Sequence, residues 1–209
     1  SAEMAKIAIN SYITSKISFA NAIGLTADSI KNCSSNDVLE AIGSDSRIGK
    51  KYLTKGLGFG GPCFPRDNRA IQEVINRVEG LEYFLPLDNE KFNKKLPIFY
   101  SKKITEICIK YKIINVLVVG LTYKDGSHLL EESQSYKISL DLSKLFKVFY
   151  FDPDVKARDV SKEIKNFKSN SKLSGNVLLI NCSRDKNKEL MARKILNEKN
   201  LKFIEFQIW

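Results

Sequence analysis

The chain contains 209 residues, of which 43% are apolar and 28% are charged, a composition that allows one large or two small globular domains. Its 34 Lys and Arg residues outnumber its 24 Asp and Glu residues and give a formal net charge of +10, an excess that attracts phosphate groups. The basic residues are interspersed with acidic ones and lack the interleaved aromatic residues of a single-strand binder, so we expect no nucleic-acid partner.

Membrane and metal-dependent classes of protein are also disfavoured. The sequence has no apolar run of about 18 residues and does not begin with a signal-peptide pattern, so we expect a cytoplasmic location and no membrane partner. The four cysteines lie far apart, without a CxxC pair or a histidine cluster, which argues against a zinc site and a disulfide framework. We expect reduced thiols at these positions, which are Cys33, Cys63, Cys108 and Cys182.

Residues 1–95 are predicted to form an all-helical domain. From Ala2 to about Glu79, apolar residues recur at helical spacing and β-branched alternation is almost absent. In the first helix, Lys6 and Asn10 are four residues apart and therefore lie one turn apart on the same face. Taken alone, this pair favours a solvated helix surface.

A glycine-rich stretch, GLGFGGPCFPRD, extends from Gly56 to Asp67. Glycines allow positive φ angles and a close approach of the backbone to a ligand, and they leave N–H groups free to bind an oxygen. Cys63 in this stretch is a candidate nucleophile whose oxyanion nearby donors would stabilise. The alternative is a cysteine that serves as a small buried apolar residue.

Residues 96–209 are predicted to form an α/β domain with a parallel sheet, because helical segments separate four apolar strands. The segment from Leu85 to Lys112 joins the two domains, and Pro97 is expected to end or kink any helix there. The predicted strands are IINVLVVG, KVFYFDPDV, GNVLLINC and LKFIEFQIW.

Several segments together carry a resemblance to a known family. AEMAKIAINSYITSKISFAN, GSDSRIGKKYL and GFGGPCFPRD resemble, in their order and spacing, the central domain of the UDP-glucose/GDP-mannose dehydrogenase family. The later segments VLVVGLTYK, Glu132-Ser133 and YFDPDV are similar to the start of the family's C-terminal UDP-binding domain. The resemblance implies an all-helical dimerisation domain followed by a Rossmann-like, parallel-sheet UDP-binding domain, with a homodimer formed through the first long helix.

The resemblance also implies an activity. The C6 alcohol of a UDP-sugar is oxidised to a carboxylate while two NAD are reduced, a reaction used in polysaccharide biosynthesis. Cys63 would form a thiohemiacetal and then a thioester. Lys6 and Asn10 would stabilise the alkoxide and oxyanion, and Asp67 would assist water or proton transfer. The CFP that follows GGP favours UDP-glucose over GDP-mannose as the substrate.

Further positions match the family's substrate-binding segments. Arg47 corresponds to an arginine that reaches the substrate across the dimer interface, with a plain surface ion pair as the alternative. Lys124 resembles a substrate-contacting lysine. The remaining predicted contacts to the nucleotide sugar are Tyr52, Leu53, Phe59 and Gly60.

Two departures from the family pattern bear on the cofactor. The family begins with an NAD-binding domain that carries GxGxxG, whereas the same letters here, from Gly56 to Gly61, follow no predicted strand and precede a cysteine. We therefore expect NAD to bind mainly to a domain that this chain lacks, and the chain alone to be inactive. Glu131 stands where the family has an arginine near the cofactor, and His128, in the same loop, is expected to be solvated.

Three functions from different classes remain open. The first is a portion of a nucleotide-sugar 6-dehydrogenase, the second is a nucleotide-sugar-binding module that has lost the oxidation, and the third is a dimerisation scaffold. The sequence favours the first, because the helix with Lys6 and Asn10 and the loop with Cys63 agree with one chemistry.

Overall fold

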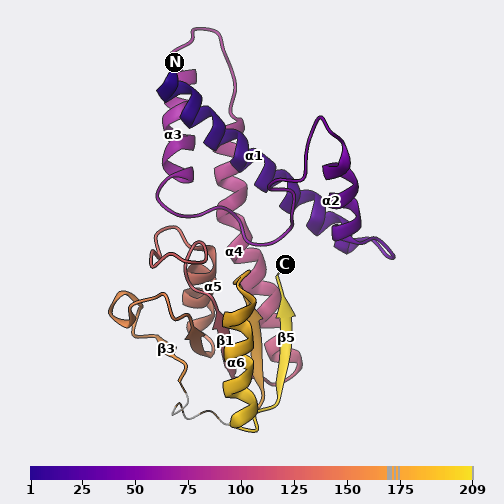
Figure 1. Ribbon diagram of the computed structural model, residues 1–209, viewed down its shortest axis with the longest axis vertical. Coiled ribbons are helices and arrows are strands. Elements are labelled where there is room, and N and C mark those ends of the chain that lie inside the picture. Colours follow the sequence, from indigo (N-terminus) through magenta and orange to yellow (C-terminus); the bar gives the residue numbers. More distant parts are fainter. Residues whose placement is uncertain (169–170, 172, 174, 209) are drawn as a thin grey trace. The chain divides into compact units, whose positions relative to one another are not determined.

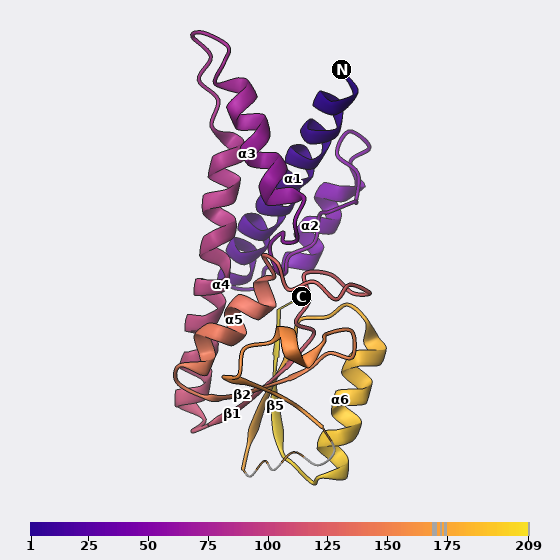
Figure 2. The ribbon, with the colours of Figure 1, turned by 90° about the vertical axis from the view of Figure 1, so that its left-hand side faces the viewer.

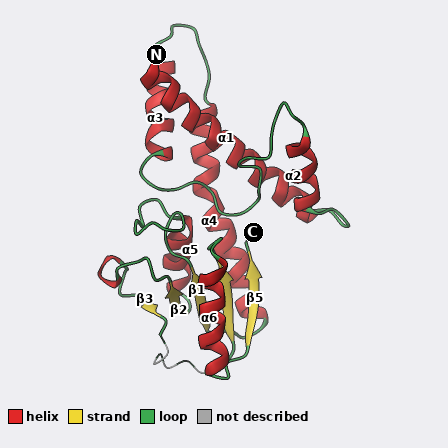
Figure 3. Ribbon diagram, viewed as in Figure 1, coloured by secondary structure: helices red, strands yellow, loops and turns green. Residues whose placement is uncertain are grey.

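The computed structural model describes residues 1–168, 171, 173 and 175–208, and it divides into two compact units, Ser1–Lys95 and Leu96–Ile208. In Figure 3 the first unit contains helices and loops, and every strand of the described chain lies in the second unit. This arrangement confirms the predicted fold class, a helical part followed by a parallel α/β part.

The first unit is built around the long helix α1 (Ala2–Ser29), which packs against α2 (Ser35–Ser44) and α3 (Phe64–Ile75) and can be followed in Figure 1. Toward these neighbours α1 buries small and polar residues, namely Ser11, Thr14, Ser18, Ala20, Asn21, Gly24 and Ala27. Small side chains let the helices approach closely, while the large apolar residues of α1 are half-buried or exposed. The exposed ones are Met4, Ile9, Tyr12 and Phe19.

Helix α4 (Leu85–Lys110) runs from the first unit into the second, with the boundary between the units after Lys95. The helix continues past Pro97, so of the two expected effects, an end or a kink, the proline does not produce an end. Proline removes one helical hydrogen bond, but the turns that follow are anchored by residues spaced four apart and buried in the second unit. These residues are Tyr100, Ile104 and Cys108.

The second unit contains a five-stranded parallel sheet with the order β3-β2-β1-β4-β5. Its strands are β1 (Asn115–Val119), β2 (Lys147–Phe151), β3 (Ile164–Asn166), β4 (Val177–Asn181) and β5 (Phe203–Gln207). Each of the four predicted strand segments contains a strand, namely β1, β2, β4 and β5, and Trp209 at the end of the last segment lies outside the described residues. The sequence analysis missed β3, because it is three residues long and only Ile164 is buried.

Helices cover both faces of the sheet, with α6 (Lys186–Glu198) on one side of the strands and α5 (Gln134–Ser143) on the other (Figure 2). On the α6 face, a buried apolar cluster contains Leu117, Val119, Phe149, Phe167, Val177, Leu179, Ala192 and Leu196. On α4, Tyr100 contacts Phe206 of β5, with the two ring centroids 6.4 Å apart. Burial on both faces explains why β1 is apolar at nearly every position rather than alternating.

The chain reverses its direction of travel across the sheet between β1 and β4. From β1 it proceeds to β2 and β3 on one side, and it then crosses to β4 and β5 on the other. Gly120, with a φ of 85°, follows β1, and an added Cβ there would lie 2.9 Å from the Cβ of Ser183, which follows β4. Only glycine permits this close approach. Ligands of open α/β sheets bind at such a switch point, outside the carboxyl ends of the strands.

Candidate functional site

Helices α1 and α3 bring three polar side chains together in the first unit. The Lys6 ammonium forms an ion pair with the Asp67 carboxylate, and Asn10 Nδ2 donates to Asp67 Oδ2 at 2.6 Å. Arg66 Nε donates to the other carboxylate oxygen, Oδ1, at 3.1 Å. The four-residue spacing of Lys6 and Asn10 therefore lets one turn of α1 hold a carboxylate that is 61 residues from Lys6 in the sequence.

In this ion pair the carboxylate of Asp67 is buried, whereas the side chain of Lys6 is exposed to solvent. Asp67 is 2% exposed, whereas the Lys6 side chain is 52% exposed. Burial raises the pKa of Asp67, but the hydrogen bonds from Lys6, Asn10 and Arg66, with the charge of Lys6, together outweigh it and lower the pKa below its ordinary value. The carboxylate is therefore ionised at neutral pH, and the exposed ammonium remains accessible to an anionic ligand.

Cys63 stands at the start of α3, one helical turn before Asp67. It is the N-cap residue of the helix, and its carbonyl accepts a hydrogen bond from the Asp67 N–H at 2.9 Å. Gly61, with a φ of 76°, turns the chain into the helix, and Pro65 suits the first turn because its fixed φ and missing N–H cost nothing there. The Cys63 thiol is exposed, which excludes the alternative of a small buried residue.

Two asparagines bind the main chain of the glycine-rich stretch to the helices, and neither was predicted from the sequence. Asn21 Oδ1 of α1 accepts from the Gly56 N–H at 2.9 Å. Asn93 of α4 makes two bonds to Phe59, accepting from its N–H at 2.9 Å and donating to its carbonyl at 2.8 Å. Both asparagines are buried, and a buried polar residue within an apolar helical pattern was the one available signal.

The predicted substrate-binding residues of the first unit occupy very different environments. Leu53 and Phe59 are 5% and 3% exposed, and Gly60 is buried, so these three residues can offer a ligand little besides their main chain. Tyr52 has a φ of 66° and an exposed ring. The Arg47 side chain is 87% exposed and forms an ion pair with Asp45 at 2.6 Å, the surface pair that the sequence left as the alternative to substrate binding.

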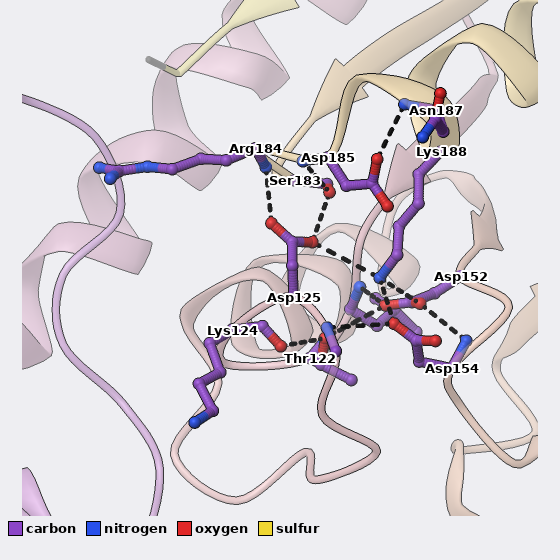
Figure 4. Close-up of polar contacts among 12 residues, drawn as sticks. Thr122, Lys124, Asp125, Asp152, Asp154, Ser183, Arg184, Asp185, Asn187 and Lys188 are labelled. Carbon is purple, nitrogen blue, oxygen red and sulfur yellow. Dashed lines mark hydrogen bonds and ion pairs between the residues drawn. The ribbon is translucent and has the colours of Figure 1, made fainter.

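A second charged cluster lies at the carboxyl ends of β1, β2 and β4 (Figure 4). Lys188 Nζ of α6 lies 2.9 Å from Asp152 Oδ1 and 2.8 Å from Asp154 Oδ2. A third carboxylate oxygen, Asp125 Oδ1, is 3.5 Å from the same ammonium. Burial lowers the pKa of Lys188, but the hydrogen bonds to Asp154 and Asp152 and their charges outweigh it and raise the pKa above its ordinary value.

The main chain after β1 is bound to the same cluster. Asp152 Oδ2 accepts hydrogen bonds from the N–H groups of Leu121 at 2.8 Å and Thr122 at 3.3 Å. These are the groups that would face a phosphate at the end of the first strand of a dinucleotide-binding fold. A carboxylate of the protein itself therefore occupies the positions that an anionic ligand would need. Asp152 lies in the DPDV end of the second predicted strand segment, KVFYFDPDV, but the sequence did not indicate which groups it would bind.

The remaining predicted residues lie in the loop between β1 and α5. Lys124 is exposed, and in Figure 4 its side chain points away from the charged cluster. Its Nζ lies 5.6 Å from the ring centroid of Tyr123. Glu131 and His128 are exposed as well. The structure therefore leaves Lys124 accessible to a ligand.

Four main-chain N–H groups, in the glycine-rich stretch and in the loop after β1, are already bonded within the protein and are not available to the diphosphate of NAD. The N–H groups of Gly56 and Phe59 in the glycine-rich stretch donate to asparagine side chains, and those of Leu121 and Thr122 donate to Asp152.

Within the described ranges, no group of three or more His, Cys, Asp or Glu residues is arranged to hold a metal ion. Nor is any helix of that part both long and apolar enough to cross a membrane.

Comparison with known proteins identifies the family. Residues 1–94 match the UDP-glucose/GDP-mannose dehydrogenase family, central domain. A putative UDP-glucose 6-dehydrogenase of Bacillus subtilis, YtcA, is 32% identical over 154 residues, which cover 73% of this chain and 36% of that protein. The UDP-glucose 6-dehydrogenase of Rickettsia felis is 34% identical over 157 residues, or 72% of this chain and 34% of that protein. The chain belongs to the UDP-glucose/GDP-mannose dehydrogenase family.

Solved structures of similar proteins extend the match beyond the central domain of the family. A UDP-glucose dehydrogenase from the archaeon Pyrobaculum islandicum covers 99% of this chain with a TM-score of 0.77 and 26% identity, and 47% of that protein is covered. The UDP-D-ManNAc dehydrogenase of Pyrococcus horikoshii, at 20% identity and a TM-score of 0.72, shares the fold over 99% of this chain and 51% of its own. The chain spans about a third of the length of the curated relatives that it matches.

Proposed function

We propose that this chain supplies the catalytic cysteine and substrate contacts of an NAD-dependent nucleotide-sugar 6-dehydrogenase. The observation that carries the proposal is the cluster of Lys6, Asn10 and Asp67 one helical turn from the exposed Cys63. Family membership supports the same activity. In the proposed reaction, C6 of UDP-glucose loses two hydrides to two NAD, which bind mainly outside this chain, and the alcohol becomes a carboxylate.

The proposed chemistry uses the cysteine after the first hydride has left. The Cys63 thiolate adds to the C6 aldehyde, and the new C–S bond leaves negative charge on the C6 oxygen of the thiohemiacetal. The Lys6 ammonium and the Asn10 amide then donate hydrogen bonds to that oxygen. Both groups already bind an anionic oxygen, that of Asp67, so their positions suit a second one nearby.

Asp67 has its proposed role in the last step. Loss of the second hydride converts the thiohemiacetal to a thioester, which water attacks. Asp67 orients this water and assists the transfer of its proton, and the Cys63 thiolate leaves as the carboxyl group forms. The lowered pKa keeps the carboxylate ionised at neutral pH, which supports the orienting part of this role, because an ionised carboxylate accepts a hydrogen bond from water.

We further propose contacts to the nucleotide sugar in each unit. In the first unit these are the side chains of Arg47 and Tyr52 and the buried segments that contain Leu53, Phe59 and Gly60, where the main chain of Phe59 is held by Asn93. In the second unit the proposed contact is the exposed Lys124. UDP-glucose is the substrate that the relatives' names favour.

The exposed apolar residues of α1 support a proposed homodimer. A helix that turns its small residues inward and presents Met4, Ile9, Tyr12 and Phe19 to solvent is expected to pack against a second copy across a two-fold axis. Light scattering should give the mass of a dimer, and replacing Ile9 and Tyr12 by glutamate should give a monomer. A monomer at micromolar concentrations of the unaltered chain would contradict this arrangement.

The activity is tested with the full-length gene product, assayed for NADH production with UDP-glucose and with GDP-mannose. Cys63→Ser should retain part of the first oxidation and block formation of the acid, so that the sugar accumulates as an aldehyde or an adduct. Cys33→Ser is the matched control, since Cys33 is a half-buried thiol of the same unit and should leave both steps unchanged. The isolated chain mixed with NAD should be inert.

One observation favours a second candidate, a nucleotide-sugar-binding module without oxidation. Glu131 stands where the family has an arginine near the cofactor. A full-length protein that binds NAD and a nucleotide sugar, yet produces no NADH with any nucleotide sugar even after Glu131→Arg, would replace the dehydrogenase by this module.

A further inference from the structure

Lys124 extends from a loop whose main chain is fastened on both sides of it. Before it, the Leu121 and Thr122 N–H groups donate to Asp152, and Thr122 Oγ1 donates to the carbonyl of Lys124 itself at 3.0 Å. After it, the Gly126 N–H donates to Asp154 at 3.3 Å. The main chain of this loop is thus engaged, while the Lys124 side chain projects into solvent.

Asp125, the residue after Lys124, attaches this loop to a second loop through two short hydrogen bonds. Its Oδ1 accepts from Ser183 Oγ at 2.5 Å, and its Oδ2 accepts from the Arg184 N–H at 2.9 Å. One carboxylate therefore bridges the loop after β1 to the loop after β4 across the switch point of the sheet.

Lys188 of α6 supports this bridge by contacting the Asp125 carboxylate. Its side chain is 4% exposed, and its ammonium contacts Asp152, Asp154 and Asp125 (Figure 4). Three carboxylates around one ammonium leave the cluster with a net negative charge, and Asp152 already occupies two main-chain N–H groups. A phosphate therefore finds neither positive charge nor free donors inside this cluster. Any attraction that the loop has for a phosphate comes from the outward-pointing Lys124.

We propose that Asp125, bridged to Ser183 and supported by Lys188, is a positioning residue that holds the backbone of Lys124 so that its ammonium binds the diphosphate of a nucleoside diphosphate. The inference rests on the proposed function, because it takes Lys124 as a substrate contact. It adds that the geometry of this contact is set by residues that do not touch the ligand.

A double-mutant cycle tests the coupling, with UDP as the probe and calorimetric titration of the full chain as the measurement. Lys124→Ala should weaken UDP binding about tenfold, the loss of one charge-assisted hydrogen bond. Asp125→Ala should weaken it by a similar factor while Lys124 is present. In the Lys124→Ala background, Asp125→Ala should cause no further loss, because it acts only through the lysine. Asp141→Ala, which removes an exposed aspartate of α5, is the matched control and should leave binding unchanged.

The outcomes separate the positioning role from the function on which it rests. If the unaltered chain does not bind UDP, the proposed nucleotide contact of the second unit fails, and the positioning role fails with it. If Lys124→Ala weakens binding but Asp125→Ala adds an independent loss in its absence, only the positioning role is overturned. Should Asp125→Ala not fold, Asp125→Asn, which keeps the shape and one acceptor, takes its place in the same cycle. Binding unaffected by either Asp125 variant would also overturn the proposal.

Discussion

Each unit contains a lysine that is paired with aspartate, and the two pairs differ in which partner faces water. In the first unit Asp67 is buried and the Lys6 side chain is 52% exposed. In the second unit Lys188 is 4% exposed and Asp152 is fully buried. The first pair keeps an accessible cation bound to a carboxylate that lies one helical turn from an exposed thiol. In the second pair the carboxylate accepts hydrogen bonds from the ammonium and from the neighbouring main chain.

The difference shows that residue type alone does not distinguish a ligand-binding ion pair from a structural one. A buried pair is costly to break, because the remaining charge is left in a poorly solvated environment. Lys6 can turn from Asp67 toward a ligand at lower cost, because its own ammonium is already partly solvated and Asp67 keeps the hydrogen bonds from Asn10 and Arg66. Burial therefore assigns Lys188 to the support of the loops and leaves Lys6 available for chemistry.

The largest expected effect comes from removing each ammonium in turn. Lys188→Met should lower the free energy of unfolding of the second unit by about 3–5 kcal/mol, because it strands buried carboxylates. Lys6→Met also leaves a buried carboxylate, but Asn10 and Arg66 still donate hydrogen bonds to Asp67, so the loss in the first unit should be smaller, about 1–2 kcal/mol. Urea denaturation with hydrogen exchange resolved by peptide would assign each loss to its unit. Lys144→Met, which removes an exposed lysine at the C-terminal end of α5, is the control, and equal losses at positions 6 and 188 would contradict the comparison.

Acid should weaken the first unit through Asp67. Its pKa is lower in the folded state, so its contribution to stability is present above the unfolded-state pKa of about 3.9 and is lost as the pH falls through the lower folded-state value. Urea denaturation from pH 7 downward should show this loss, and Asp67→Asn should flatten the profile. Asp88→Asn, at an exposed ion pair with Lys91, should leave the profile unchanged. An unaltered slope in Asp67→Asn would argue that the carboxylate is not stabilised by its partners.

The ion pair of Arg47 with Asp45 provides a third case, in which the cation is almost fully exposed to solvent. Because its side chain is 87% exposed, Arg47→Ala should leave the unfolding midpoint unchanged. Affinity for UDP-glucose in the dimer should fall about tenfold if the arginine binds the substrate. Arg158→Ala, at another exposed arginine, is the control for both measurements. Unchanged affinity would return Arg47 to a surface role.

The smallest expected effect is on the reactivity of the cysteines. Iodoacetamide at neutral pH should modify Cys63 faster than Cys33, and Lys6→Ala should slow the modification of Cys63 a few-fold, because it removes a cation from the cluster. Cys108 and Cys182 should react slowest, since both are buried and burial raises the pKa of Cys108 to about 11. Peptide mass spectrometry gives the rates, and Lys51→Ala is the control. Equal rates at Cys63 and Cys33 would count against an activated thiol.

Local patterns in the sequence were sufficient for most of the fold. Apolar runs bounded by turn residues predicted β1, β2, β4 and β5, because strands buried on both faces need apolar residues at nearly every position. They were insufficient for β3, whose three residues carry too little apolar surface to form a pattern. Pro97 does not end α4, because the penalty of proline is local and the burial that offsets it comes from the second unit.

For the candidate site, the sequence by itself determined which residues are near one another along the chain. The spacing of Lys6 and Asn10 placed them on one helix face, and the glycines marked the loop that presents Cys63. Only the tertiary structure decided which distant groups meet. Asp67 lies across from Lys6 because α3 packs against α1, and Lys188 meets Asp152 because α6 begins at the edge of the sheet where β2 ends. Helical and strand periods report local geometry, whereas these partners depend on packing between segments far apart in sequence.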